Sequence, residues 1–146
     1  MSLDTQDRAD CAALAALLAG QDTLARWSLW LSALALAALC FVPAPGAAAL
    51  LLSAAALLGL PERYLAFRLR LDQRLFDALA AGRIADLAAL DRSLAHIGLR
   101  TAPEGGTRPL ADRLRGTRRL VRGHASIVAV QSLVFLAAIA ARLAFP

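Results

Sequence analysis

Few side chains in this sequence have a type and spacing that could carry out a reaction. The two histidines, His96 and His124, are far apart, and neither Cys11 nor Cys40 has a second cysteine or a histidine at metal-ligand spacing. We interpret both histidines as solvated or interfacial and both cysteines as small apolar packing residues. The P-loop, dinucleotide-binding, serine-hydrolase and zinc-peptidase motifs are also absent from the sequence. We therefore expect no enzyme activity, no cofactor and no metal site.

Arginine is the charged residue with the most informative placement. All 16 basic residues are arginines, and the run RPLADRLRGTRRLVRGH at 108–124 directly precedes a long apolar segment. Two roles remain open for this juxtamembrane cluster: binding of anionic lipid headgroups and control of membrane topology. Nucleic acid is not an expected partner, because no aromatic residues are interleaved with the cations. The cluster consists of Arg113, Arg115, Arg118, Arg119 and Arg122.

Gln131 and Ser132 are polar residues inside the last apolar segment. An amide in hydrocarbon needs a hydrogen-bond partner, and such bonds join helices in membranes. We therefore expect these two residues to take part in helix–helix interaction, within one chain or between chains.

The apolar segments that would position these residues predict a membrane protein. Residues 125–145 contain one charged residue, Arg142, and as a helix they would extend roughly 30 Å, enough to cross a bilayer. Residues 23–60 hold two further apolar runs separated by PAPG at 43–46, which predicts a transmembrane helical hairpin. A re-entrant hairpin that does not cross fully is the alternative.

Residues 1–22 form an acidic, amphipathic segment. Asp4, Asp7 and Asp10 precede an apolar run, Gly20 is expected to end a helix in a left-handed conformation, and Asp22 is expected to cap the next helix. The acidic start argues against a cleaved signal peptide. We expect this segment to lie against the arginine-rich segment on the same side of the membrane.

Residues 61–124 are an arginine-rich segment that holds 13 of the 16 arginines. The positive-inside rule places it and the N-terminus in the cytoplasm, with the C-terminus in the periplasm, for a multi-pass protein of the bacterial inner membrane. Helix 62–81 carries two apolar stripes, so it is expected to pack on two sides. The stripe residues are Tyr64, Leu71 and Leu75 on one face and Leu65, Leu69 and Phe76 on the other.

The rest of the arginine-rich segment is divided by turn signals. Gly82 ends the first helix, Asp86 caps a short helix over 87–97, and Gly98 with Leu99 ends it. The loop at 101–109 is rich in Pro and Gly, and a last cytoplasmic helix starts at Thr107 or Arg108.

The predicted fold is all-α, a polytopic membrane protein with three spans. Its parts are the N-terminal segment 1–22, the hairpin 23–60, the cytoplasmic helical subdomain 61–124 and the third span 125–146. The function expected first is a small, non-enzymatic inner-membrane subunit that self-associates or scaffolds a larger membrane complex. The alternatives are a small channel, transporter or membrane-permeabilising protein, and a protein that binds anionic lipids of the cytoplasmic leaflet.

Overall fold

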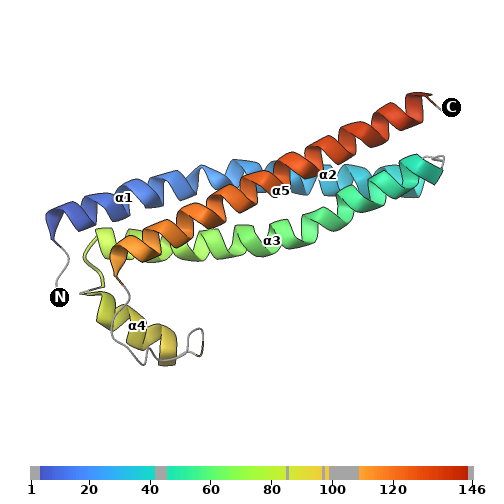
Figure 1. The fold of residues 1–146 in the computed structure, drawn as a ribbon. Helices are drawn as coiled ribbons and strands as arrows, with labels where there is room; N and C mark the ends of the chain where they lie inside the picture. Colours follow the sequence, from blue (N-terminus) through green and yellow to red (C-terminus); the bar gives the residue numbers. More distant parts are fainter. Residues whose placement is uncertain (1–3, 42–45, 85, 97, 99–108, 145–146) are drawn as a thin grey trace. The chain divides into compact units, whose positions relative to one another are not determined.

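The computed structural model describes residues 4–41, 46–84, 86–96, 98 and 109–144, and these form five α-helices (Figure 1). They are α1 (Thr5–Ala19), α2 (Gln21–Phe41), α3 (Gly46–Ala80), α4 (Leu87–His96) and α5 (Leu110–Ala144). The all-α prediction is confirmed for this described part. Residues 43–45 of the predicted hairpin turn, residues 101–108 of the predicted loop, and the expected contacts of Ile97 and Leu99 lie outside it.

Three helical stretches are long and apolar enough to cross a membrane. They are Thr5–Phe41, Gly46–Ala80 and Leu110–Ala144, the first of which comprises α1 and α2. Their length and composition agree with the three predicted apolar segments.

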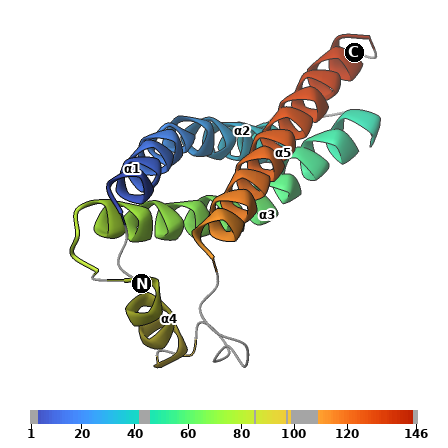
Figure 2. The same cartoon turned by 60° about the vertical axis from the view of Figure 1, so that its left-hand side comes forward.

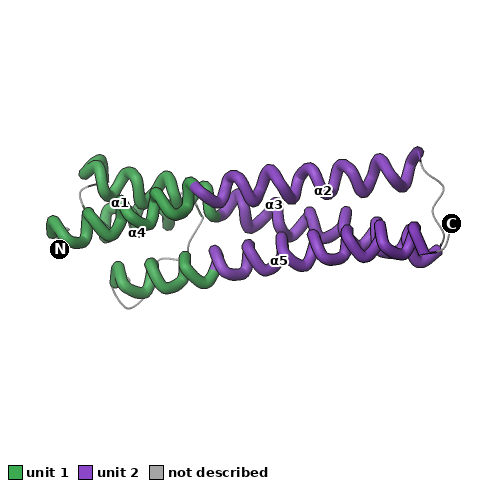
Figure 3. Tube along the Cα trace, turned by 90° about the horizontal axis from the view of Figure 1, so that it is seen from above, with its two compact units in different colours: residues 1–19, 69–119 green, residues 20–68, 120–146 purple. Residues whose placement is uncertain are grey.

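The chain folds into two compact units, coloured separately in Figure 3. Unit 1 comprises Met1–Ala19 and Leu69–Arg119, and unit 2 comprises Gly20–Arg68 and Leu120–Pro146. Helices α3 and α5 each contribute one part to each unit, whereas α1 and α4 belong to unit 1 and α2 to unit 2.

Unit 2 packs small side chains at the centre of its three helices. Ala35, Leu52, Ala55 and Ala138 form a buried cluster, against which Phe135 and other partly buried apolar residues pack. Buried positions in α3 recur at alternating steps of three and four residues, the repeat that keeps one face of a helix against its neighbours. In unit 2 these positions are Ala48, Leu52, Ala55, Gly59, Glu62 and Ala66.

In unit 1, the N-terminus of α1 is capped by hydrogen bonds between Asp4 and Asp7. The backbone N–H of Asp7 donates to Asp4 Oδ1 at 2.7 Å, and the N–H of Asp4 donates to Asp7 Oδ2 at 3.3 Å. This reciprocal pair satisfies two donors that a helix N-terminus leaves free. Because α1 clusters with 69–119, the N-terminal segment lies against part of the arginine-rich segment, and Cys11, Leu14 and Leu18 of α1 are buried.

Helices α3 and α5 run without interruption through the positions at which the sequence changes from apolar to arginine-rich. α3 contains Pro61 in its interior, and α5 continues from Leu110 to Ala144. Proline is tolerated in apolar spanning helices when neighbouring groups satisfy the backbone that it frees. The change in composition at 60–61 and 124–125 is therefore not accompanied by a helix end.

Glycines at two predicted helix ends adopt the left-handed conformation. Gly82 has φ +68° after α3, and Gly98 has φ +73° after α4, the short helix in Figure 2. At the start of α4, the backbone N–H of Ala89 donates to Asp86 Oδ1 at 2.7 Å, which confirms the predicted cap. This bond is the first cause that lowers the pKa of Asp86 below the usual value of 3.8.

Two details predicted for the end of the N-terminal segment are wrong. Gly20 does not have a positive φ, and Asp22 lies inside the first turn of α2 rather than at its cap. The reason is that α2 begins at Gln21, directly after Gly20, so the chain resumes a helix without the reversal that a left-handed glycine produces.

Candidate functional site

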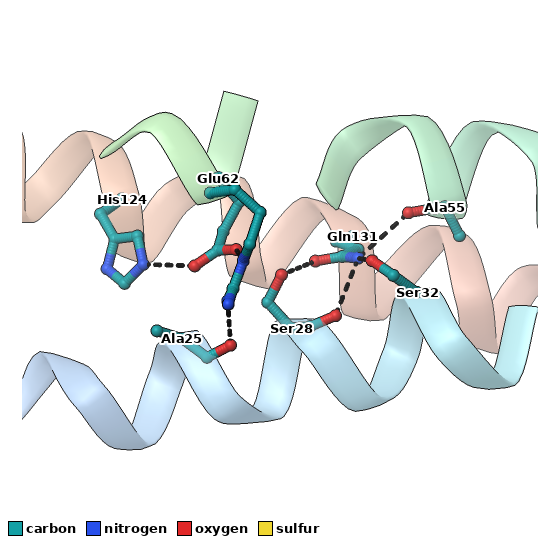
Figure 4. A network of polar contacts seen from close by, with 8 residues as sticks. Ala25, Ser28, Ser32, Ala55, Glu62, His124 and Gln131 are labelled. Carbon is teal, nitrogen blue, oxygen red and sulfur yellow. Dashed lines mark hydrogen bonds and ion pairs between the residues drawn. The ribbon is translucent and has the colours of Figure 1, made fainter. Parts of the chain in front are cut away.

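The polar side chains buried in unit 2 form the candidate site (Figure 4). Ser28 on α2, Glu62 on α3, and His124 and Gln131 on α5 are each fully buried. Burial of so many polar groups is costly unless they bond to one another, so their partners decide what the site can do.

Glu62 and His124 form the ionisable part of this network. His124 Nε2 lies 2.8 Å from Glu62 Oε1, and His124 Nδ1 lies 3.1 Å from Gln21 Oε1 at the first residue of α2. Both ring nitrogens therefore have a partner on a different helix. The interpretation of His124 as a solvated or interfacial residue is wrong, because its side chain has no exposed surface.

Arg63 supplies the positive charge beside Glu62. Its Nε donates to Glu62 Oε2 at 2.7 Å, and its Nη2 donates to the backbone carbonyl of Ala25 on α2. The side chain of Arg63 is 40% exposed, whereas that of Glu62 is fully buried. Both carboxylate oxygens of Glu62 thus accept hydrogen bonds, and the arginine neutralises the carboxylate from the outer side.

Gln131 forms the second part of the network, and all three helices of unit 2 meet around its amide. The hydroxyl of Ser28 donates to Gln131 Oε1 at 2.6 Å. The Nε2 of Gln131 lies within donating distance of Ser32 Oγ at 2.9 Å, the Ala55 carbonyl at 3.0 Å and the Ser28 carbonyl at 3.3 Å. The structure places this predicted interaction residue in contact with α2 and α3 of its own chain.

Gly59 leaves the space that this arrangement needs. A Cβ at Gly59 would collide with the Ser32 hydroxyl and would lie 3.7 Å from Gln131 Nε2. The absence of a side chain at this position therefore lets α3 approach the serine and amide groups closely.

Ser132 joins α5 to α2 at the edge of the same region. The indole N–H of Trp27 donates to Ser132 Oγ at 3.1 Å, and the Ser132 hydroxyl donates to the Val128 carbonyl at 2.8 Å. Trp27 remains half exposed, as is common for tryptophan at a boundary between apolar and polar surroundings.

The predicted stripe residues of α3 are distributed over both units. In unit 2, Tyr64 is exposed and Leu65 is half-buried. In unit 1, Leu69 and Phe76 are buried, while Leu71 and Leu75 are half-buried. One stripe is therefore covered more completely by the chain itself than the other.

The predicted arginine cluster divides into one buried and several exposed side chains. Arg113 Nη2 lies 2.5 Å from Asp91 Oδ1 on α4, and its side chain is only 12% exposed. Arg115 is 81% exposed and lies 3.4 Å from Asp112, and Arg118, Arg119 and Arg122 are exposed as well. Arg113 thus holds α4 and α5 together in unit 1 and differs from the other four.

Sequence reasoning missed Glu62 and His124, although a signal was present. His124 lies seven residues before Gln131, and seven residues after Thr117, which is also buried and donates to Asp72 Oδ2 at 3.1 Å in unit 1. A spacing of seven returns to the same helix face. The three buried polar residues of α5, Thr117, His124 and Gln131, therefore share one face of the helix, which an analysis of apolar residues alone does not reveal.

Among the residues that the structure describes, no group of three or more His, Cys, Asp or Glu side chains could hold a metal ion. No family model, no curated protein and no solved structure matches this chain.

Proposed function

We propose that this chain is a small non-enzymatic subunit of a bacterial inner-membrane assembly, in which unit 2 spans the bilayer and unit 1 lies on the cytoplasmic side. The observation that carries the proposal is the exterior of unit 2. Within the described ranges, every exposed large apolar side chain except Leu17 belongs to unit 2. An apolar exterior of this extent is stable against lipid and would be unfavourable in water.

The interior of unit 2 supports a structural role over catalysis. The side chains of Ser28, Glu62, His124 and Gln131 are fully buried, and each is bonded to another residue of unit 2. Groups that satisfy one another in this way stabilise helix packing, whereas a catalytic group has to reach a substrate.

The exposed part of α3 supports association with another membrane protein or with a second copy. Tyr64 and Phe67 both remain exposed just beyond Pro61, and Phe67 is 70% exposed. Exposed aromatic residues of this kind are typical of interfaces and of the membrane boundary. The proposal is that a homo-oligomer or a larger membrane complex forms through such surfaces.

The orientation is tested with single cysteines. In a variant with Cys11→Ala and Cys40→Ser, Gly46→Cys would place a thiol in open space at the start of α3, and Ser93→Cys would place one on the exposed face of α4. A membrane-impermeant maleimide should label Gly46→Cys in intact cells and Ser93→Cys only after permeabilisation. The reverse pattern would refute the orientation, and failure to label Gly46→Cys under either condition would indicate the re-entrant hairpin.

The assembly is tested by the mass of the protein purified from native membranes. We expect a defined oligomer, or a stoichiometric complex whose partner is identified by mass. A strictly monomeric protein that carries no membrane partner would contradict the proposal. The matched variants are Tyr64→Ala and Phe67→Ala, which should weaken the assembly, and Trp30→Ala on the exposed face of α2 serves as the comparison.

Binding of anionic lipid is a second candidate function, favoured by the exposed arginines of α5. Arg115, Arg118 and Arg119 are available to phosphate groups, with about 1 kcal/mol for each cation near the surface. Replacement of these residues and Arg122 by Gln should lower binding to vesicles with anionic lipid, while Arg113→Gln should instead loosen α4. Orientation has to be checked in the same variants, since the arginines also bear on topology.

A further inference from the structure

The hydrogen bonds around His124 raise a question about its protonation. As placed, both ring nitrogens face oxygen atoms: Glu62 Oε1 at 2.8 Å from Nε2 and Gln21 Oε1 at 3.1 Å from Nδ1. A neutral imidazole has a single N–H and can donate to one of these oxygens only. An imidazolium has two N–H groups and can donate to both.

The neutral ring also fits the site after one small change. The oxygen and nitrogen of a glutamine amide have nearly the same shape, and a half-turn of the amide exchanges them. After this half-turn, Gln21 Nε2 would donate to Nδ1 of His124, and His124 Nε2–H would still donate to Glu62. Both protonation states of His124 then have a hydrogen-bond partner at each ring nitrogen without movement of the ring.

Glu62 fixes the nitrogen at which the proton exchanges. Its carboxylate accepts from His124 at Oε1 and from Arg63 at Oε2. A carboxylate opposite Nε2 keeps a proton on that nitrogen in both states. The exchanging proton therefore belongs to Nδ1, on the side of Gln21.

We propose that His124 is a reversible proton-binding site buried in unit 2, and that the side-chain amide of Gln21 turns to match its protonation state. A proton from solvent joins the lone pair of Nδ1, the amide presents its oxygen to the new N–H, and the charge of the Glu62–Arg63–His124 cluster rises from zero to +1. This proton site goes beyond the proposed structural function and does not depend on the association of copies.

Charged residues on the helices around the His124 ring affect the free energy of adding a proton to it. The ring itself contacts a neutral amide on α2 and a carboxylate on α3. The titratable and charged residues of the same turns are Asp22 and Arg26 on α2, Glu62 and Arg63 on α3, and Arg122, which is exposed, on α5.

The test compares the two histidines of the chain. In protein labelled with ¹⁵N-histidine and reconstituted in lipid nanodiscs, imidazole ¹⁵N chemical shifts report which nitrogens carry a proton. His96, whose side chain is exposed on α4, is the internal control. For His124 we expect Nε2 to stay protonated, while Nδ1 gains a proton as the pH falls. A Nδ1 that stays in one state from about pH 4 to pH 9, or an exchanging Nε2, would overturn the proposal.

Substitution of Gln21 tests the contribution of its side-chain amide separately from that of Glu62 and Arg63. Gln21→Glu supplies only an acceptor to Nδ1, so at a pH within the transition the ratio of protonated to neutral His124 should rise about tenfold. Gln21→Met removes the bond to Nδ1 in both states, but the bond to the charged ring is the stronger one, so the ratio should fall by about ten. Gln6→Met, on the exposed face of α1, is the matched control and should leave the ratio unchanged. Shifts in the same direction for both Gln21 variants would contradict the role of the amide.

Discussion

The two units of this chain bury different mixtures of side chains. In unit 1 the buried residues include Leu18, Leu69, Phe76 and Leu79, and among its described residues Leu17 is the one large apolar side chain that is exposed. In unit 2, Leu31, Leu52 and Val128 are buried, but the other buried residues are small or polar, while most of its leucine and aromatic side chains are exposed. The difference indicates that apolar burial stabilises unit 1, and close backbone approach with hydrogen bonds stabilises unit 2.

The proposed position of unit 2 in the bilayer, with unit 1 in water, would account for this difference. In water, a leucine gains free energy by leaving the surface, which favours large apolar residues inside. In lipid, the surroundings are as apolar as leucine, so helices gain from small residues and polar contacts at their interfaces. The comparison can be tested by substitutions that should affect one unit and spare the other.

The largest effect is expected from Phe76→Ala in unit 1. Phe76 is buried, so its truncation should lower the free energy of unfolding of unit 1 by about 3–5 kcal/mol. Hydrogen exchange of unit 1 amides in nanodiscs measures this. The control is Trp30→Ala in unit 2, which removes an exposed ring and should leave stability nearly unchanged. Equal losses for both variants would remove the distinction between the units.

A smaller effect is expected from Gln131→Leu in unit 2. Here it removes the hydrogen bonds to Ser28, Ser32 and the Ala55 carbonyl, and unit 2 should lose about 2 kcal/mol. Unfolding of the purified protein in mixed detergent micelles gives the difference from wild type. Ser132→Ala is the milder comparison, with a loss of about 0.6 kcal/mol. An increase in stability for Gln131→Leu would show that unit 2 has an ordinary apolar core.

Gly59→Ala should cost unit 2 about 1 kcal/mol, because the new methyl group occupies the position of the Ser32 hydroxyl. In the double variant Gly59→Ala with Ser32→Ala, the clash is removed and part of the loss should be recovered. A double-mutant cycle in the same detergent unfolding measurement provides the coupling energy between the two positions. Additive losses would mean that the two residues do not compete for this space.

The smallest effect is local and is expected at the start of α4. The pKa of Asp86 is lowered in the folded chain, mainly by the Ala89 N–H, so the ionised carboxylate is the form that caps the helix. Its contribution is present above the usual pKa of 3.8 and is lost as the pH falls through the lowered folded value. Amide exchange of Ala89 should accelerate in acid for wild type. Asp86→Ala should show the fast exchange already at neutral pH, and wild-type exchange without this dependence would contradict the cap.

The apolar runs, the turn glycines and the cap were within reach of sequence reasoning. Gly82, Gly98 and Asp86 act through neighbouring residues, and the apolar runs act through composition, so neither requires knowledge of distant contacts. The same reasoning was wrong at Gly20 and Asp22. There, α2 begins at Gln21, directly after Gly20. The preference of Asp22 for a cap position could not predict where the helix begins.

The sequence by itself determined an all-helical chain with three long apolar stretches and a concentration of arginine between two of them. Only the tertiary structure decided that Glu62, His124 and Gln21 meet, that Arg113 turns inward to Asp91, and that Gln131 is bonded within its own chain. The reason is that helix formation and hydrophobicity are properties of neighbouring residues, whereas a buried polar group can be stable only beside a partner that is 62 or 103 positions away in the sequence.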